Sequence, residues 1–364
     1  MKITIWTGSA WEPWGPASVE DGGIGGSETA AVHMARELAR RGHEVTCFGQ
    51  HTGFEGTWDG VLYRNFEAAI TDSSLLDCDV FVSSRDKRAL RLKPHARYKV
   101  LWVHDIHVGD DFEQELLKYD RIWCLTEWHR KTLQGYYAHV SKSKLTVIRN
   151  GIDAARFVQV EPHSTRKPHF VYSSSPDRGL NVLLDLWPQI KALRSDAELH
   201  VYYGFDTWEK MAVRNKVGQA QIAWFKERLI GERAEKAQIW YHGRVGQAEL
   251  AAAFSKSPLW LYPTGFKETY CITALEAQAA GAVPISTRLA ALSETVKVGT
   301  LIAPHNTEAR YRTEFLDACK HFLITHPEEA TKLSGEGRAW AMEQTWSKLA
   351  DAWLAEFDTA LAES

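Results

Sequence analysis

Two glutamates, Glu268 and Glu276, have the spacing in this sequence that best suits ligand binding. Glu268 precedes, and Glu276 lies within, a helix expected over residues 270–280, with Gly281 as its end. The N-terminus of such a helix offers free backbone N–H groups and the positive end of the helix dipole, which suit a phosphate. The two glutamates lie about 9–12 Å apart along the helix. They could hold two hydroxyl-bearing parts of one extended ligand, or they could be two solvated helix glutamates.

The elements that position this helix alternate between strands and helices along the whole chain. Residues 28–41 show the three-and-four spacing of an amphipathic helix, with Ser27 as the expected N-cap and Gly42 after its end. Strands followed by helices indicate parallel sheets with helices on both faces. We therefore expect an α/β protein, with strands at residues 2–6, 44–48, 79–83, 99–103, 121–126, 145–148, 169–173, 198–203, 238–242, 259–262 and 283–286.

A polar, proline-containing stretch at residues 159–168 interrupts the alternation and is the expected linker. We therefore predict a Rossmann-like N-terminal domain at 1–160 and a Rossmann-like C-terminal domain at 161–339. A tryptophan-rich C-terminal helix at 340–364 is expected to pack back towards the N-terminal domain. Open α/β sheets bind ligands beyond the carboxyl ends of their strands. The functional residues should therefore lie in loops after strands, on both sides of a cleft between two facing domains.

The composition excludes several classes of protein. The 364 residues are 45% hydrophobic and 24% charged, and the net charge of −3 gives no sign of a nucleic-acid-binding protein. Five cysteines are scattered singly, which indicates neither a zinc cluster nor a disulfide framework and fits a reducing compartment. The sequence lacks the apolar core of a signal peptide and any run of about 20 apolar residues. We expect a cytoplasmic protein.

The residues around Glu268 and Glu276 resemble the retaining glycosyltransferases of family 4, which have the GT-B fold. The resemblance lies in the two glutamates with seven residues between them, followed by Ala277, Gly281 and Pro284 at the family's offsets. Three further segments match the family and extend the resemblance to both domains: Gly25-Gly26-Ser27-Glu28, Asn150-Gly151-Ile152-Asp153 and Ser175-Pro176-Asp177-Arg178-Gly179-Leu180.

The resemblance implies roles for individual residues. Glu268 would bind hydroxyls of the donor sugar, and Glu276 would bind the ribose of the nucleotide. Arg178 would neutralise the leaving diphosphate, a charge-assisted contact that makes a metal ion or other cofactor unnecessary. The backbone of the donor site would come from Thr269, Tyr270 and Cys271 and from the glycine-rich loop at Gly25 and Gly26.

One position departs from the family pattern. Members usually carry an arginine about five residues before the basic residue at Arg178, and this sequence has Ser173 there. Hydroxyl and backbone groups could take part of that role, or another cation could. Arg244 is the candidate cation, and a surface arginine without a ligand is the alternative.

The N-terminal domain offers further candidates. His104 follows a strand and resembles the family's histidine beside the donor sugar, with His107 as its rival in the same loop and a candidate acceptor contact. Trp11 and Trp14 lie in the long loop after the first strand, where they could stack on an acceptor sugar or could simply pack the loop.

Seven basic residues lie between positions 85 and 99. They could meet an anionic membrane surface or a lipid-diphosphate acceptor, or they could form an ordinary solvated face. The seven are Arg85, Lys87, Arg88, Arg91, Lys93, Arg97 and Lys99.

The sequence as a whole favours a retaining hexosyltransferase that uses a UDP- or GDP-linked sugar and a glycan or glycolipid acceptor. The resemblance implies a front-face mechanism, in which the departing phosphate takes the acceptor proton. A nucleotide-sugar epimerase or phosphorylase on the same fold is one alternative. A non-catalytic subunit that binds nucleotide sugars is the other.

Overall fold

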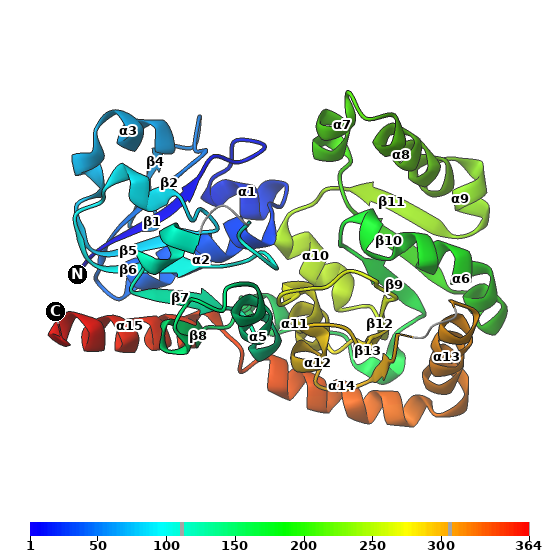
Figure 1. The fold of residues 1–364 in the computed structure, drawn as a ribbon. Helices are drawn as coiled ribbons and strands as arrows, with labels where there is room; N and C mark the ends of the chain where they lie inside the picture. The colour runs from blue at the N-terminus through cyan, green and yellow to red at the C-terminus, as the bar shows by residue number, and fades with distance from the viewer. Residues whose placement is uncertain (110–112, 305–307, 364) are drawn as a thin grey trace. The chain divides into compact units, whose positions relative to one another are not determined.

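The structure is a computed structural model that describes residues 1–109, 113–304 and 308–363. The chain forms two compact units (Figure 1). The N-terminal unit comprises Met1–Glu20, Ile24–Gly151 and Gln344–Ser364, and the C-terminal unit comprises Asp21–Gly23 and Ile152–Glu343. The main division therefore falls between Gly151 and Ile152, ahead of the boundary expected at 160.

The N-terminal unit is built on one eight-stranded sheet in the order β3-β4-β2-β1-β5-β6-β7-β8. All neighbouring strands are parallel except β3 and β4. The order reverses at β1, which lies between β2 and β5 as in a doubly wound Rossmann-like sheet. The strands are β1 (Lys2–Gly8), β2 (Glu44–Gly49), β3 (Gly56–Trp58), β4 (Val61–Asn65), β5 (Cys78–Ser84), β6 (Ala96–Trp102), β7 (Arg121–Cys124) and β8 (Leu145–Val147).

Among the described residues, six α-helices belong to this unit, and the sequence predicted two of them. The amphipathic helix predicted after the first strand is α2, and it begins at Gly26 with Gly25 as its N-cap. The prediction of Ser27 as N-cap is therefore wrong. Ser27 lies inside the first turn, and its hydroxyl donates to the Glu28 carboxylate (2.9 Å). The helices are α1 (Pro16–Asp21), α2 (Gly26–Arg40), α3 (Phe66–Thr71), α4 (Glu113–Leu117), α5 (Glu127–Tyr136) and α15 (Trp346–Glu363).

The C-terminal helix α15, red in Figure 1, belongs to the N-terminal unit. Its Trp353 is fully buried between the rings of Trp102 (4.8 Å between centroids) and Trp123 (4.4 Å). At the helix start, Asp351 forms an ion pair with Arg41 (2.8 Å). Several of the fifteen tryptophans thus fill the core of this unit instead of binding a ligand.

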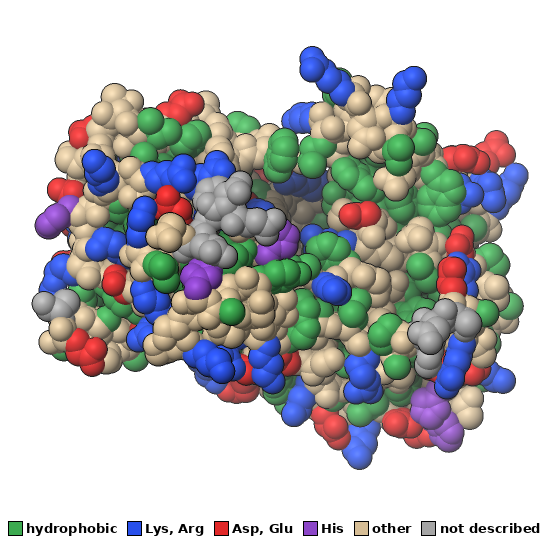
Figure 2. Space-filling model, in the orientation of Figure 1, with side chains coloured by type: hydrophobic (Ala, Val, Ile, Leu, Met, Phe, Trp, Pro, Cys, Tyr) green, Lys and Arg blue, Asp and Glu red, His purple; other side chains and the backbone are tan. Residues whose placement is uncertain are grey.

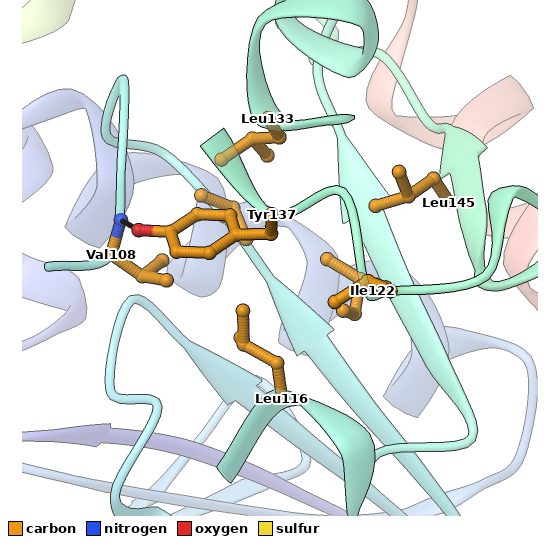
Figure 3. Close-up of a pocket in the computed structure, with 8 residues that line it drawn as sticks. Val108, Leu116, Ile122, Leu133, Tyr137 and Leu145 are labelled. Atoms are coloured by element: carbon orange, nitrogen blue, oxygen red, sulfur yellow. Dashed lines mark hydrogen bonds between the residues drawn. The ribbon is translucent and has the colours of Figure 1, made fainter. Parts of the chain in front are cut away.

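A small apolar pocket lies in the N-terminal unit beside α4, α5 and the strands β6 to β8 (Figure 3). Its lining is aliphatic except for Tyr137, whose hydroxyl accepts from Val108 N–H (2.8 Å) and donates to the Gly109 carbonyl (3.1 Å). Because that hydroxyl is already engaged, the pocket has no free polar group to orient a sugar or a phosphate. It is a gap in the core packing.

The C-terminal unit contains two parallel three-stranded sheets, ordered β11-β10-β9 and β12-β13-β14, with β9 lying against β12. The strand order therefore reverses between β9 and β12, which makes this unit Rossmann-like as well. Two Rossmann-like α/β units are what the sequence predicted. The strands are β9 (His169–Tyr172), β10 (Glu198–Tyr202), β11 (Ile239–Gly243), β12 (Leu259–Tyr262), β13 (Val283–Thr287) and β14 (Thr300–Ile302).

Helices cover these sheets (Figure 1). They are α6 (Leu180–Leu193), α7 (Asp206–Ala212), α8 (Lys216–Leu229), α9 (Glu232–Lys236), α10 (Gln247–Phe254), α11 (Ile272–Ala279), α12 (Leu292–Thr295), α13 (Glu308–Lys320) and α14 (Pro327–Ala341).

The stretch at residues 159–168 is fixed to the C-terminal unit. Arg166 donates to the carbonyls of Ser257 (2.8 Å) and Ala280 (2.7 Å), and His163 pairs with the carbonyl of Pro258 (3.0 Å). Three backbone carbonyls therefore hold this polar segment in place, so it is not the free linker that its composition suggested.

The surface agrees with the small net charge. On the face drawn in Figure 2, Lys and Arg side chains are interspersed with Asp and Glu side chains. Within the described part of the chain, no helix combines the length and the apolar character needed to cross a bilayer.

Candidate active site

Two loops of the C-terminal unit meet where the strand order reverses. One follows β9 and contains a short 3-10 turn at Pro176–Arg178, and the other follows β12 and leads into α11. Gly179 separates that turn from α6 with φ of +113°, and a Cβ there would lie 2.4 Å from the carbonyl oxygen of Pro263. Only glycine allows the loops to approach this closely. The approach brings the ends of β9 and β12 together at the place where open α/β sheets bind ligands.

Glu268 lies at the centre of this meeting point and is 6% exposed. Its carboxylate accepts from the Tyr262 hydroxyl (2.7 Å) and from Nη1 of Arg178 (3.2 Å to Oε1 and 3.4 Å to Oε2). The Arg178 guanidinium in turn lies over the ring of Phe266, 4.1 Å from its centroid. The structure thus joins two residues that the sequence singled out ninety positions apart. Together they present an oriented carboxylate next to a fixed positive charge.

Tyr262 is a functional candidate that the sequence analysis did not name. It is the last residue of β12 and is 1% exposed. Burial and then the Glu268 charge raise the pKa of Tyr262 above its ordinary value, so the phenol stays protonated and donates. The sequence did contain a signal for it, because Tyr262 ends a strand six residues before the candidate carboxylate Glu268.

The helix after Glu268 begins later than predicted. Helix α11 starts at Ile272, and Cys271 is its N-cap with φ of +71°, a left-handed conformation that is rare outside glycine. Tyr270 is 4% exposed, so its side chain packs in the core and does not face a ligand. Burial followed by the Glu268 charge raises the pKa of the Cys271 thiol well above its ordinary value. The thiol therefore stays protonated and does not act as a nucleophile.

Glu276 lies inside α11 in a different environment from Glu268. Burial raises its pKa to about 7, although the charge of Arg156 opposes the shift and that of Asp153 adds to it. Arg156 is held against Asp153 (3.0 Å), and both belong to the segment just after the division between the units. Burial thus keeps Glu276 protonated to a higher pH than an ordinary glutamate.

The departure at Ser173 leaves a polar atom without a partner. The Ser173 hydroxyl oxygen, just beyond β9, is buried and has no hydrogen-bond partner among the described residues. Arg244, the candidate replacement cation, is exposed just beyond β11 and packs against Gly204, whose Cβ would lie 3.0 Å from that of Arg244. Since β10 separates β9 from β11, the two residues follow non-adjacent strands. Compensation of Ser173 by Arg244 stays a prediction.

The carboxyl ends of the central strands in the N-terminal unit carry a second polar cluster. Arg85 follows β5 with φ of +66° and makes two hydrogen bonds of 3.0 Å to the Asp105 carboxylate. It also reaches the Ser27 hydroxyl (3.4 Å) and the Glu28 carboxylate (3.9 Å) at the start of α2. A strained backbone at a bidentate arginine is typical of a functional site. The sequence analysis counted Arg85 only as part of a basic run.

The two glycines of the predicted donor loop adjoin this cluster. Gly25 is the N-cap of α2 and Gly26 is its first residue. A Cβ on Gly25 would lie 2.4 Å from a carboxylate oxygen of Glu28, which is the far end of a flexible side chain and can move aside.

His104 is half-buried just after β6, with its ring 4.5 Å from that of Trp102. Burial, then the charges of Arg85 and His129, lower the pKa of His104 to about 3. The imidazole is therefore neutral at physiological pH and can act only as a hydrogen-bonding group there. His107 is exposed, its Nδ1 accepts from Gly109 N–H (3.1 Å), and its ring faces Tyr136 at 5.6 Å.

The two tryptophans proposed for the acceptor have different environments. Trp14 is 1% exposed and packs edge-on against the His51 ring (4.4 Å), so it cannot stack on a ligand and the prediction for it is wrong. Trp14 packs the loop instead, which was the alternative that the sequence analysis gave. Trp11 is 75% exposed and is free to stack on a ligand.

Comparisons with known proteins agree with this geometry. Residues 167–321 match the family model described as "Glycosyl transferases group 1". That match includes Arg178, Glu268 and Glu276. No curated protein matches the chain.

Solved structures share the whole fold at low sequence identity. Sucrose-phosphate synthase from Thermosynechococcus elongatus superposes with a TM-score of 0.75 at 14% identity, covering 100% of both chains. A glycosyltransferase from Rickettsia africae gives 0.70 at 14%, again with 100% of both chains. Anabaena Alr3699/HepE in complex with UDP-glucose gives 0.70 at 12%, also with full coverage of both. Residues 167–321 therefore form a group 1 glycosyltransferase domain, in a chain that has the GT-B fold of these solved structures.

Proposed function

We propose that this protein is a retaining hexosyltransferase that takes its sugar from a UDP- or GDP-linked donor. The observation that carries the proposal is the group of Glu268, Tyr262 and Arg178 at the reversal point of the C-terminal sheet. An oriented carboxylate beside a fixed guanidinium suits a ligand that has hydroxyl groups next to a diphosphate. The group 1 family match over residues 167–321 supports the same assignment.

Each member of the site has a separate proposed role. Glu268 accepts hydrogen bonds from the hydroxyls of the transferred sugar, and Tyr262 keeps its carboxylate in position. Arg178, with backbone N–H groups of residues 269–271, neutralises the diphosphate as it leaves. Glu276 accepts from the ribose hydroxyls of the nucleotide. Since protein groups supply this positive charge, the proposed reaction uses no metal ion.

The proposed chemistry is a front-face displacement. The bond between the anomeric carbon and the diphosphate oxygen breaks, and the acceptor oxygen forms its new bond on the same face. The acceptor proton passes to the departing phosphate, so neither a nucleophilic carboxylate nor a cofactor is required. His104, neutral at physiological pH, contributes a hydrogen bond to the sugar instead of a proton.

The proposed acceptor is a glycan or a glycolipid made in polysaccharide biosynthesis on the cytoplasmic side of a membrane. The basic residues at positions 85–99 are the proposed contact with an anionic lipid surface. At least four of them also have protein partners. Arg85 pairs with Asp105 (3.0 Å) and Arg91 pairs with Glu115 (3.0 Å). Arg97 donates to the carbonyl of Leu361 (2.7 Å), and Lys99 donates to the carbonyl of Ala96 (2.6 Å). Trp11 is the proposed aromatic platform for the acceptor sugar.

Replacement of Glu268 tests the proposal. A screen of nucleotide sugars by thermal stabilisation identifies the donor, starting with UDP-glucose, the ligand in the HepE structure. With that donor, Glu268→Gln is expected to lower the rate of transfer by about 100-fold or more, as loss of an oriented polar contact at a transition state does. Glu235→Gln, at an exposed glutamate of α9, is the matched control and should transfer normally.

The products distinguish the alternatives. Interconversion of the donor without an acceptor indicates an epimerase, and a product that carries inorganic phosphate indicates a phosphorylase. Nucleotide binding without turnover in the unmodified protein indicates a non-catalytic subunit. Normal transfer by Glu268→Gln contradicts the assigned site, and an inverted anomeric configuration in the product contradicts retention.

A further inference from the structure

A second polar cluster lies on the outer strands of the C-terminal unit and plays no part in the proposed reaction. On β10 the side chains of Leu199 and Val201 are buried, so Glu198 and His200 point to the opposite face of the sheet. Glu198 pairs in register with His169, the first residue of β9. His242 extends the same cluster from β11.

The side chains in this cluster lie close enough to share one ligand. Ligand atoms of His169, Glu198 and His200 all lie within 4.8 Å of one another. The rings of His169 and His200 lie face to face with centroids 3.7 Å apart, so one of them must rotate for both in-plane lone pairs to reach the same ion. The ring of His242 lies nearly parallel to that of His200 at 5.1 Å. Nε2 of His169 is buried and has no hydrogen-bond partner within the described chain. A buried nitrogen of this kind costs free energy unless something binds it.

The hydrogen bonds of His200 indicate which of its ring nitrogens could bind a metal ion. Its Nδ1 lies 2.9 Å from Nε2 of His242, whereas its Nε2 lies 3.4 Å from the Glu198 carboxylate, beyond the usual range for an N–H···O bond. If Nδ1 carries the proton and donates to His242, then Nε2 presents a lone pair to a carboxylate oxygen. Two acceptors that face each other need a cation between them.

The spacing of those two acceptors matches that of metal ligands. Two atoms each bound about 2.1 Å from a tetrahedral zinc ion lie about 3.4 Å from each other. The separation of 3.4 Å between Nε2 of His200 and the Glu198 oxygen equals that distance. We propose that His169, Glu198 and His200 bind a divalent transition-metal ion of the zinc class, with His242 as the hydrogen-bond partner that fixes the His200 tautomer.

The electrostatics of the cluster are compatible with a metal ion. Burial, followed in each case by the charges of neighbouring histidines, lowers the pKa values of His169 and His200 to about 4. Both rings are therefore neutral at pH 7, the form that binds metals. The positive charge of Lys256 also acts on both rings, and at His169 the carboxylate of Glu198 opposes it.

The position of the site points to a structural metal. His169 and Glu198 are the first residues of β9 and β10, whereas the candidate donor residues follow the carboxyl ends of β9 and β12. A metal there links two neighbouring strands at the end of the sheet away from the proposed chemistry. The inference stands independently of the proposed function.

Zinc binding by purified protein without a polyhistidine tag tests the inference. After chelator treatment, equilibrium dialysis against zinc chloride and elemental analysis should show one zinc ion per chain. His169→Asn and His200→Asn should abolish that binding, while His242→Ala should weaken it by about 10–100-fold, as loss of the partner of a metal-binding histidine does. His321→Asn is the matched control, because His321 also faces a glutamate (Glu329, 2.8 Å) outside the cluster.

Two further measurements separate metal binding from a general effect on folding. The variants should show the circular dichroism and melting temperature of the unmodified protein in the presence of chelator. Zinc should raise the melting temperature of the unmodified protein and not that of His200→Asn, and cobalt substitution should give the visible absorption bands of a low-coordinate site. Absence of bound zinc in the unmodified protein, or equal binding by His200→Asn, overturns the inference.

Discussion

The substitution Glu276→Gln is expected to stabilise the protein at neutral and alkaline pH while weakening its binding of the nucleotide sugar. The expectation rests on the environment of Glu276, where burial raises the pKa of the carboxyl group to about 7 from an ordinary 4.5. In the unfolded chain Glu276 is ionised above pH 4.5, whereas in the folded chain it keeps its proton until about pH 7. Its contribution to stability is therefore full below pH 4.5 and is lost as the pH rises through 7.

The structure sets the size of the effect. At 1.36 kcal/mol for each pKa unit, the difference between 7 and 4.5 amounts to about 3 kcal/mol. Because Glu276 is partly exposed, solvent screening reduces the expected gain of Glu276→Gln to about 2 kcal/mol. For a domain of this size that gain raises the melting temperature by about 4–8 °C at pH 8. At pH 4.5 the gain should nearly disappear, since the carboxyl group is then neutral in the folded chain and half protonated in the unfolded chain.

Thermal unfolding of both proteins at a series of pH values measures this difference. Glu235→Gln, at an exposed site, controls for the loss of one negative charge. Isothermal titration with the donor then measures the functional cost, which should be about 10–100-fold in affinity if Glu276 accepts hydrogen bonds from the ribose. The reasoning is refuted if Glu276→Gln is no more stable than the unmodified protein at pH 8, or if its advantage is the same at pH 4.5 and pH 8.

Three further substitutions test other parts of the structure. Tyr262→Phe removes the 2.7 Å hydrogen bond to Glu268 and should lower kcat/KM about 10-fold in steady-state assays, and an unchanged value means that the phenol does not position the carboxylate. Gly179→Ala should lower the free energy of unfolding by about 2 kcal/mol or more in urea titrations, because of its φ of +113° and its close contact. The control Gly335→Ala, in open space on α14, should raise it by about 0.5–1 kcal/mol. Trp11→Ala should raise the KM for the acceptor without changing the KM for the donor or the melting temperature, and a changed melting temperature would assign Trp11 to packing instead.

The strands were the most predictable part of the fold. Each expected strand is present, because most of these strands are buried on both faces and read as short apolar runs. The three that the sequence analysis missed are β3, β4 and β14, which have three to five residues and several half-exposed positions. The stretch at 159–168 was misjudged because its polar residues suggested solvent, whereas Arg166 uses its polarity to bind backbone carbonyls.

The sequence predicted which residues of the candidate site follow strands. It did not predict the backbone conformation of the loops that carry them. The sequence placed Glu268 and Arg178 in loops that follow strands, and the structure joins the two side chains. The positive φ values of Cys271 and Arg85 are rare for such residues, and no local sequence rule indicates them. The burial of Trp14 likewise depends on His51, a residue distant in sequence.

The two glutamates of the motif are chemically identical in the sequence but not in the structure. Glu268 meets a guanidinium and a phenol that both stabilise its negative charge, whereas Glu276 lies in a region where burial outweighs the charge of Arg156. Replacement by glutamine should therefore have opposite effects on stability, because it takes a partner from Arg178 at one position and removes a buried charge at the other. Proteins commonly give up stability at sites that bind ligands. The ionised form of Glu276 lowers the stability of the folded protein. The presence of a glutamate at this position is therefore best explained by a ligand that its carboxylate binds.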